Sequence, residues 1–239
     1  PWRDYAIVLN AAAFTAVDAA ETAEGRVMAW RANATAPALL SRAADDYGFL
    51  FIHYSSEYVF DGTREVHSED EPLSPLGVYA QSKAAGDVAV STTRRHYLLR
   101  TSWVVGEGRN FVRTIHELAH KGVSPKIVDD QVGRLTFTTE LARATAHLID
   151  TGADFGVYNV TNGGKSMTWF DVAVNIFTLT GRNPNDVLRT STAEYSKGKQ
   201  LAPRPPHSVL DLSRLESTGF APESAMTALK RYVRQFDEK

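Results

Sequence analysis

The sequence predicts an α/β protein built on a doubly wound parallel sheet, and three observations support this prediction. Apolar runs of strand length recur along the first part of the chain, and helix-forming segments separate them. The runs are apolar throughout, which suits strands that are buried on both faces of a sheet. Small or polar residues follow the runs, at the edge of the sheet where such folds bind their ligands.

The first half of the chain alternates strands and helices. The expected strands cover residues 6–13, 49–54 and 97–105, and the expected helices cover residues 27–47 and a run that begins at residue 79. Ala11–Ala13, Ser55–Glu57 and Trp103 then fall at the carboxyl ends of the strands. Because these ends meet at one edge of a parallel sheet, we expect the three segments to border one ligand site.

The second half is less regular. We expect helices at residues 111–120, 138–149 and 168–180, a strand at 156–161, a proline-rich segment at 201–208, and one or two short helices in the last thirty residues. Thr138 is expected to cap its helix, since threonine is favoured at that position. No internal repeat or flexible linker divides the chain, so any second domain shares it closely with the first.

Composition argues against several classes of protein. Lysine plus arginine number 26 and aspartate plus glutamate 28, so the formal net charge is −2 and no basic surface for nucleic acid or an anionic membrane is indicated. No cysteine is present, which excludes disulfides, thiolate metal sites and cysteine nucleophiles. No apolar run approaches the ~20 residues that span a bilayer. We therefore expect a cytoplasmic protein.

The segment from Pro72 to Asp87 carries the strongest chemical signal. Its prolines and Gly77 end before Tyr79, where a helix-forming run begins. Tyr79 and Lys83 are four residues apart, so they share one face of that helix. An ammonium group one turn away is expected to lower the pKa of the tyrosine hydroxyl. Such a pair can exchange a proton with a carbonyl or alcohol oxygen, although an isolated Tyr-x-x-x-Lys is more often an ordinary helix face.

A zinc site is the main competing pattern. His116-Glu-Leu-Ala-His120 matches H-E-x-x-H, and Glu140 stands about where one group of zinc proteases has a third ligand. Against zinc, the helix is expected to stop at Gly122, and Lys121 is charged where those enzymes hold an uncharged residue. We expect a solvated helix face here and no metal.

Two further motifs are better explained as turns than as functional sites. Gly163-Gly-Lys-Ser166 resembles the end of a phosphate-binding loop, but Asn159 replaces the first required glycine, so a strand-to-helix turn is expected. Asp129-Asp130 suits an acid–base or metal pair, and a solvated turn is the favoured alternative.

Six ordered blocks resemble the extended short-chain dehydrogenase/reductases, and most closely the dTDP-4-dehydrorhamnose reductases. The family patterns are N-A-A-A-x-T-x-V-D, S-T-D-Y-V-F-D-G, Y-G-x-T-K-x-x-G-E, R-T-S-W, D-x-Q-x-G-x-x-T and R-P-x-x-S. Their counterparts are residues 10–18, 55–62, 79–87, 100–103, 129–136 and 204–208. Each block alone is a weak signal, whereas six in order through nearly the whole chain are a strong one.

The resemblance implies a fold and an activity. It implies a Rossmann-like nucleotide-binding domain over residues 1–178, of which 104–128 contribute to a smaller, interleaved substrate lobe made mainly by 179–239. It implies reduction of the 4-keto group of dTDP-4-dehydro-L-rhamnose to dTDP-L-rhamnose with NADPH or NADH. The implied partners are this dTDP-sugar and a second copy of the chain in a homodimer.

The resemblance also implies the site residues. Tyr79 is the proton donor, Lys83 holds the nicotinamide ribose, and Ser56 stands where the family has a helper threonine, so these three are the catalytic residues. Ser56, Glu57 and Trp103 border the substrate; Glu57 replaces an aspartate. The cofactor is bordered by Ala11, Ala12, Ala13 and Tyr54 together with Tyr79 and Lys83.

One departure from the family pattern concerns the cofactor. The family opens with a glycine-rich strand-turn-helix that binds the pyrophosphate, and no G-x-x-G-x-x-G precedes Ala6. We therefore expect the given sequence to be part of a longer chain that carries this N-terminal unit.

Related activities remain as alternatives. Dehydratases of the superfamily follow their threonine with Asp-Glu, whereas Glu57 and Tyr58 follow Ser56, so the second carboxylate is missing. Epimerases share Tyr-x-x-x-Lys but fit the other blocks less well. A non-catalytic regulatory subunit that binds NADP and a partner enzyme is the alternative from another class.

Overall fold

The computed structural model describes residues 2–237, and a four-stranded parallel sheet in the order β1-β2-β3-β8 forms its centre. The strands are β1 (Ile7–Asn10), β2 (Leu50–Ser56), β3 (His96–Thr101) and β8 (Gly156–Asn159). Adjacent strands are in register through Ile7 and Leu50, Phe51 and His96, and Tyr97 and Gly156. β2 and β3 are buried along almost their whole length because both faces of the sheet are covered.

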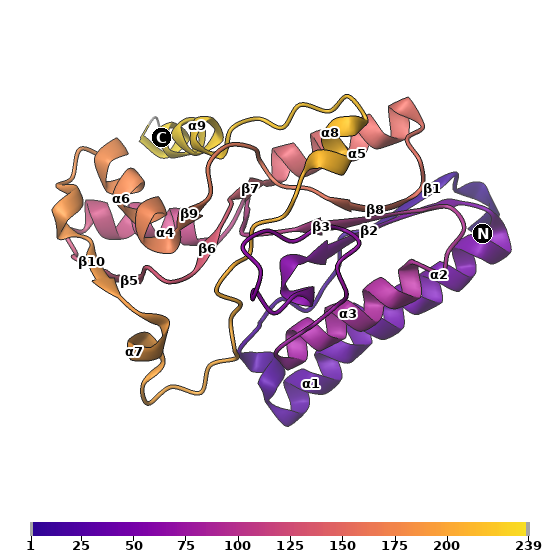
Figure 1. Cartoon of the computed structure of the whole chain (residues 1–239), viewed down its shortest axis with the longest axis horizontal. Helices are drawn as coiled ribbons and strands as arrows, with labels where there is room; N and C mark the ends of the chain where they lie inside the picture. Colours follow the sequence, from indigo (N-terminus) through magenta and orange to yellow (C-terminus); the bar gives the residue numbers. More distant parts are fainter. Residues whose placement is uncertain (1, 238–239) are drawn as a thin grey trace.

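Helices cover both faces of this sheet (Figure 1). One face carries α1 (Ala23–Trp30), α2 (Ala36–Tyr47) and α3 (Val78–Val90), and the other carries α5 (Thr138–Thr151) and α8 (Ser213–Ser217). Successive side chains of a strand point to opposite faces of the sheet. On one face Phe51 packs with Val90 of α3, and on the other Ile52 packs with Leu148 of α5. The predicted fold class, a doubly wound parallel sheet, is confirmed.

A second group of helices lies at one end of the sheet and surrounds its own core (Figure 1). It contains α4 (Phe111–His120), α6 (Trp169–Leu179) and α9 (Ala225–Asp237), with the short parallel pair β5 (Lys126–Val128) and β10 (Leu188–Thr190). Ile115 of α4, Ile176 of α6 and Leu229 of α9 meet in this core. The sequence prediction assigned α6 to the larger unit, which was to end at residue 178. Its apolar face instead packs with the segments predicted for the smaller lobe.

Short pairings connect the two groups of helices. β4 (Val104–Val105) pairs with β7 (Thr136–Phe137), and β6 (Val132–Gly133) pairs with β9 (Met167–Thr168); α7 (Thr192–Ser196) lies in the segment that follows β10. Within residues 2–237, no helix is both long and apolar enough to cross a bilayer.

Three element boundaries differ from the sequence prediction. The first strand ends at Asn10 and not at residue 13, because the Asn10 side chain accepts a hydrogen bond from the Ala12 N–H and turns the chain. The strand expected over 97–105 breaks at Trp103, whose φ of 43° is incompatible with a strand. Thr138 does not cap α5: Phe137 occupies the cap position, and its own side chain makes no capping hydrogen bond.

The helix expected over residues 27–47 has a different internal structure. It begins at Ala23 and contains one π-helical turn, Arg31–Thr35, between α1 and α2. Asn33 lies inside this turn and is fully buried. Such turns occur frequently at functional sites, and this one faces the helix that carries Tyr79.

Candidate active site

A cavity of about 580 Å³ opens at the carboxyl ends of the central strands. The predicted site residues that line it are Ala11, Ala13, Tyr54, Ser56, Glu57, Tyr79, Lys83 and Trp103. Ala12 is the exception, because it follows the turn at Asn10 and does not border the cavity. Residues from three strand ends and from α3 are thus brought together, as the positions of these segments in the sequence predict.

The N-terminal end of α3 positions Tyr79 and Lys83. Gly77 precedes the helix and has no side chain to cap it, so the Glu21 carboxylate accepts a hydrogen bond from the Val78 N–H at 2.8 Å. Lys83 is 2% exposed, and its Nζ donates to the carbonyl oxygen of Tyr54 at 2.7 Å. The bond uses one of three ammonium protons, so the amine keeps donors for a ligand.

Ser56 and Glu57 form a hydrogen-bonded pair at the end of β2. Ser56 Oγ donates to Glu57 Oε2 at 2.8 Å and accepts from the Tyr58 N–H at 3.2 Å. Glu57 is 4% exposed. Burial raises the pKa of Glu57 to about 7, although hydrogen bonds from Ser56 and from the backbone of Glu57 and Trp103 lower it. The cavity therefore contains a carboxyl group that titrates near neutrality.

Burial also governs the ionisation of Tyr79 and Lys83. The pKa of Tyr79 is raised by burial and then by the Glu57 carboxylate, while a hydrogen bond with Ser56 lowers it. This direction is opposite to the lowering predicted from the spacing of Tyr79 and Lys83, because removal from water and the nearby Glu57 carboxylate both disfavour the tyrosinate. The pKa of Lys83 is itself lowered to about 8 by burial, against the attraction of Asp87.

Two tryptophans form one wall of the cavity. The Trp103 ring stacks on Trp169 with their centroids 3.6 Å apart and their planes 12° apart. On Gly133, an added Cβ would lie 2.5 Å from Trp103 Cε2, so only glycine leaves room for the indole. Sequence reasoning missed Trp169; its position directly after Thr168, which caps α6 in a capping box, gives no hint that its ring reaches the cavity.

Asn33 is a second residue that sequence reasoning placed on a helix without a role. Its amide donates to the Phe14 carbonyl and to Ser82 Oγ, both at 3.0 Å, and accepts from the Phe14 N–H at 2.9 Å. Ser82 Oγ in turn donates to the Tyr79 carbonyl at 2.7 Å. The π-helical turn therefore ties the segment after β1 to the turn of α3 that presents Tyr79.

A second cavity of about 560 Å³ adjoins the first, and Trp169 lines both. Its walls combine aromatic, cationic and amide side chains, among them Phe111, Lys126, Gln131, Tyr195 and Arg204. Asp18, which lies between β1 and α1, binds the proline-rich segment: its carboxylate accepts from the Ala202 N–H at 2.9 Å and from Arg204 Nη2 at 2.8 Å.

The competing motifs lie outside these cavities. His116 Nε2 and His120 Nε2 are 3.1 Å apart on α4, while Glu140 binds Arg143 and the Glu223 N–H. Among residues 2–237, no group of three or more potential metal ligands is found. Gly163 forms a β-bridge with Ser224, and none of residues 163–166 lines either of the two cavities.

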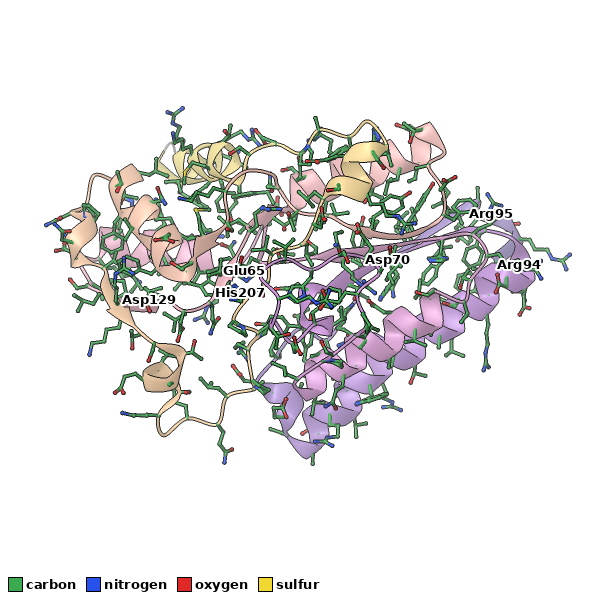
Figure 2. All side chains as sticks on the ribbon, viewed as in Figure 1. Glu65, Asp70, Arg94, Arg95, Asp129 and His207 are labelled. Carbon is green, nitrogen blue, oxygen red and sulfur yellow. The ribbon has the colours of Figure 1, made fainter. Side chains whose placement is uncertain are left out.

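The paired aspartates take part in local contacts. Asp129 lies in the lobe that carries β5 and β10 (Figure 2), where Arg189 Nη1 donates to it at 3.2 Å. Asp130 accepts from the Thr192 N–H at 2.8 Å. Both therefore brace the segment around α7.

Comparisons with known proteins agree with this geometry. The model of the RmlD substrate binding domain family matches residues 3–238. A dTDP-4-dehydrorhamnose reductase of Burkholderia thailandensis is 38% identical over 227 residues, which cover 88% of this chain and 74% of the relative. A probable dTDP-4,6-dihydroxy-2-methyloxan-3-one 4-ketoreductase of Streptomyces antibioticus is 40% identical over 223 residues, or 90% of this chain and 72% of the relative.

A solved structure is similar in both sequence and fold. The dTDP-4-dehydrorhamnose reductase of Bacillus anthracis, crystallised in complex with NADP, superposes with a TM-score of 0.86 and 32% identity, over 98% of this chain and 81% of that one. The chain therefore belongs to the RmlD substrate binding domain family, the dTDP-4-dehydrorhamnose reductase family that its sequence motifs predict.

Proposed function

We propose that the protein reduces the 4-keto group of dTDP-4-dehydro-L-rhamnose to dTDP-L-rhamnose, with NADPH or NADH as the reductant. The observation that carries the proposal is the convergence of Tyr79, Lys83 and Ser56 on one cavity at the carboxyl edge of a parallel sheet. The names of the relatives and the NADP complex of the Bacillus anthracis enzyme support the substrate and the cofactor.

The residues at the cavity fit a nicotinamide cofactor. Ala11 and Ala13 border the cavity with small side chains, which allow a planar ligand to approach the backbone closely. Lys83 keeps ammonium donors for ribose hydroxyls beside its bond to Tyr54. A bound reduced nicotinamide supplies the hydride that the carbonyl carbon receives.

The remaining chemistry falls to this chain's own side chains. Tyr79 donates its proton to the carbonyl oxygen as negative charge develops there. Ser56 donates a hydrogen bond to the same oxygen and stabilises that charge. Lys83, held by Tyr54, favours the tyrosinate that remains after the transfer. The stacked pair Trp103 and Trp169 forms an apolar wall against the sugar.

We place the nucleotide part of the substrate in the second cavity. Lys126 and Arg204 offer positive charge for a diphosphate, and Phe111 and Tyr195 offer aromatic faces for a base. Trp169 borders both cavities, so one substrate can extend from the nucleotide site to Tyr79. A related dTDP-linked 4-keto sugar is the second candidate substrate, because the Streptomyces antibioticus relative is named for one.

The test is NADPH oxidation by the full-length protein given each keto sugar nucleotide. Tyr79→Phe should lower kcat by about 10²–10⁴-fold, since that is the usual contribution of proton transfer. Tyr47→Phe is the matched control, because Tyr47 is 44% exposed on α2 and borders neither cavity. Equal turnover by the Tyr79→Phe and parent proteins contradicts the proposal. An inactive parent that binds NADP and a partner enzyme supports the regulatory-subunit alternative instead.

We also expect a homodimer and a cytoplasmic location. Sedimentation of the full-length protein tests the first, and cell fractionation tests the second. The preference for NADPH or NADH is measured by the same assay with each cofactor.

A further inference from the structure

Glu57 is a buried carboxyl group whose partners are all hydrogen-bond donors. Ser56 Oγ donates to its Oε2 at 2.8 Å, and the backbone of Glu57 and Trp103 also bonds it. Among residues 2–237, no lysine, arginine or histidine forms an ion pair with it. The carboxyl therefore faces one hydroxyl and two N–H groups, and only the hydroxyl can reverse its direction.

The Ser56 hydroxyl has a single proton to donate. Its oxygen already accepts from the Tyr58 N–H at 3.2 Å, and Ser56 lines the same cavity as Tyr79. When Glu57 is ionised, the carboxylate takes the Ser56 proton and leaves none for a substrate oxygen beside Tyr79. When Glu57 is protonated, its own O–H can donate to Ser56 Oγ, and the Ser56 proton is free.

We infer that Glu57 is a positioning residue that sets the direction of the Ser56 hydroxyl, and that keto reduction requires the protonated carboxyl. The inference rests on the proposed function, since it concerns how Ser56 reaches the carbonyl oxygen. It involves no covalent step: one proton from solvent neutralises the carboxylate, the Ser56–Glu57 hydrogen bond reverses, and the Ser56 proton turns to the substrate oxygen.

The surroundings make this change accessible near neutral pH. Burial raises the pKa of Glu57 to about 7. The groups around it are Tyr58 and Tyr79, whose pKa values are raised by burial and by Glu57 itself, and Lys83, whose pKa is lowered to about 8. Asp18 and Arg204 act on Tyr58 with opposite signs.

Glutamine should lock the productive direction. The N–H groups of Glu57 and Trp103 can only donate, so the amide oxygen satisfies them and the amide nitrogen donates to Ser56 Oγ. The parent loses the protonated form above its pKa, and the Glu57→Gln variant does not. The ratio of kcat/KM for Glu57→Gln to that of the parent should therefore rise about tenfold per pH unit above neutrality.

The experiment compares pH profiles of kcat/KM from about pH 6 to pH 8.5 for five full-length proteins. They are the parent, Glu57→Gln, Ser56→Ala, the double variant of these two, and Glu69→Gln. Glu69 is the matched control, because burial also raises its pKa but it bonds the Asn159 N–H and lines neither cavity. Its substitution should leave the parent's profile unchanged.

The outcomes separate this inference from the proposed function. A rising ratio that disappears in the Ser56→Ala background supports action through Ser56. Identical profiles for Glu57→Gln and an active parent overturn the inference alone, as does an effect of Glu57→Gln that persists without Ser56. A parent that reduces no keto sugar at any pH overturns the proposed function instead.

A measurement independent of turnover completes the test. Infrared titration of the unliganded parent should show a protonated carboxyl band that disappears near pH 7 and that is missing from Glu57→Gln. If this carboxyl titrates at the ordinary glutamate value of 4.5, the inference is wrong.

Discussion

At the scale of single residues, Glu57 connects the ionisation of one side chain to the stability of the whole protein. Its pKa in the folded chain is about 7, against an ordinary value of 4.5. The folded state thus retains this proton over a range of pH in which the unfolded state has lost it. As pH rises through that range, the folded state loses stability relative to the unfolded state.

The first prediction follows from this loss of stability with rising pH. The free energy of unfolding of the parent should fall by roughly 2.5 kcal/mol more between pH 5 and pH 8 than that of Glu57→Gln. Urea unfolding at both pH values is the measurement. Glu117→Gln is the control, because the Glu117 side chain is 55% exposed and its substitution should leave the parent's pH dependence intact. Parallel losses in the parent and in Glu57→Gln would argue against a raised pKa.

The second prediction concerns the Trp103 ring and Gly133. Gly133→Ala places a methyl group 2.5 Å from Trp103 Cε2, so the indole must move from Trp169. We expect KM for the sugar nucleotide to rise and stability to fall by about 1–3 kcal/mol. Gly122→Ala is the control. Gly122 has a φ of +71° and nothing lies within 4 Å of the added Cβ, so this substitution introduces backbone strain without a steric clash. A KM that changes equally in both variants contradicts a specific role for the wall.

At the scale of elements, the packing of the π-helical turn against α3 fixes where Tyr79 lies. An added Cβ on Gly86 would be 2.1 Å from the Asn33 carbonyl oxygen, so the two elements approach as closely as glycine permits. The hydrogen bonds from Asn33 to Ser82 and from Ser82 to Tyr79 run through the same contact. The spacing of the two elements is therefore set by backbone contact.

Gly86→Ala gives the third prediction, in which the sign of the change in stability tests the close contact with Asn33. In an ordinary helix interior this substitution stabilises by about 0.5–1 kcal/mol. Here the clash with Asn33 should reverse the sign and destabilise by about 1–3 kcal/mol, with a loss of kcat as Tyr79 shifts. Denaturant unfolding and steady-state kinetics measure the two effects. A stabilised, fully active variant would show that the π-helical turn yields easily.

The elements also show what the sequence could and could not predict. The apolar runs around Phe51 and Leu98 predicted the parallel sheet, because strands buried on both faces need little else. Helical spacing placed Tyr79 and Lys83 together and a strand end placed Ser55–Glu57 beside them, whereas the role of Ser56 came from the family resemblance. The break at Trp103 was not predictable, since the local sequence shows neither its φ of 43° nor its stacking on Trp169, which lies far away in the chain. The raised pKa of Tyr79 was missed because burial is a property of the folded chain.

At the scale of the whole molecule, the proposed substrate path lies where the sheet meets the second group of helices. Asp18 holds the proline-rich segment across this junction through the Ala202 N–H and Arg204. Arg204 is also part of the wall of the second cavity. One ion pair therefore connects the segment between β1 and α1 to the proposed nucleotide site.

The fourth prediction tests this coupling. Asp18→Ala should raise KM for the sugar nucleotide about fivefold, because a charge-assisted hydrogen bond at a half-exposed site contributes on the order of 1 kcal/mol. kcat at saturation should change less, since Tyr79 keeps its place on α3. Asp186→Ala is the control: it removes the Arg182 ion pair, which borders neither cavity. A KM equal to that of the parent would mean that the segment holds its position without Asp18.

The stacked indoles of Trp103 and Trp169 also make the cavity optically visible. Two identical chromophores 3.6 Å apart and 12° from parallel couple their electronic transitions, and in a chiral protein such coupling splits the far-ultraviolet circular dichroism into a couplet. The other two tryptophans, Trp2 and Trp30, have no indole partner of this kind among the ring contacts of residues 2–237. The couplet therefore arises at the substrate wall alone, and its amplitude offers a label-free signal for ligand binding, lost in Trp169→Phe.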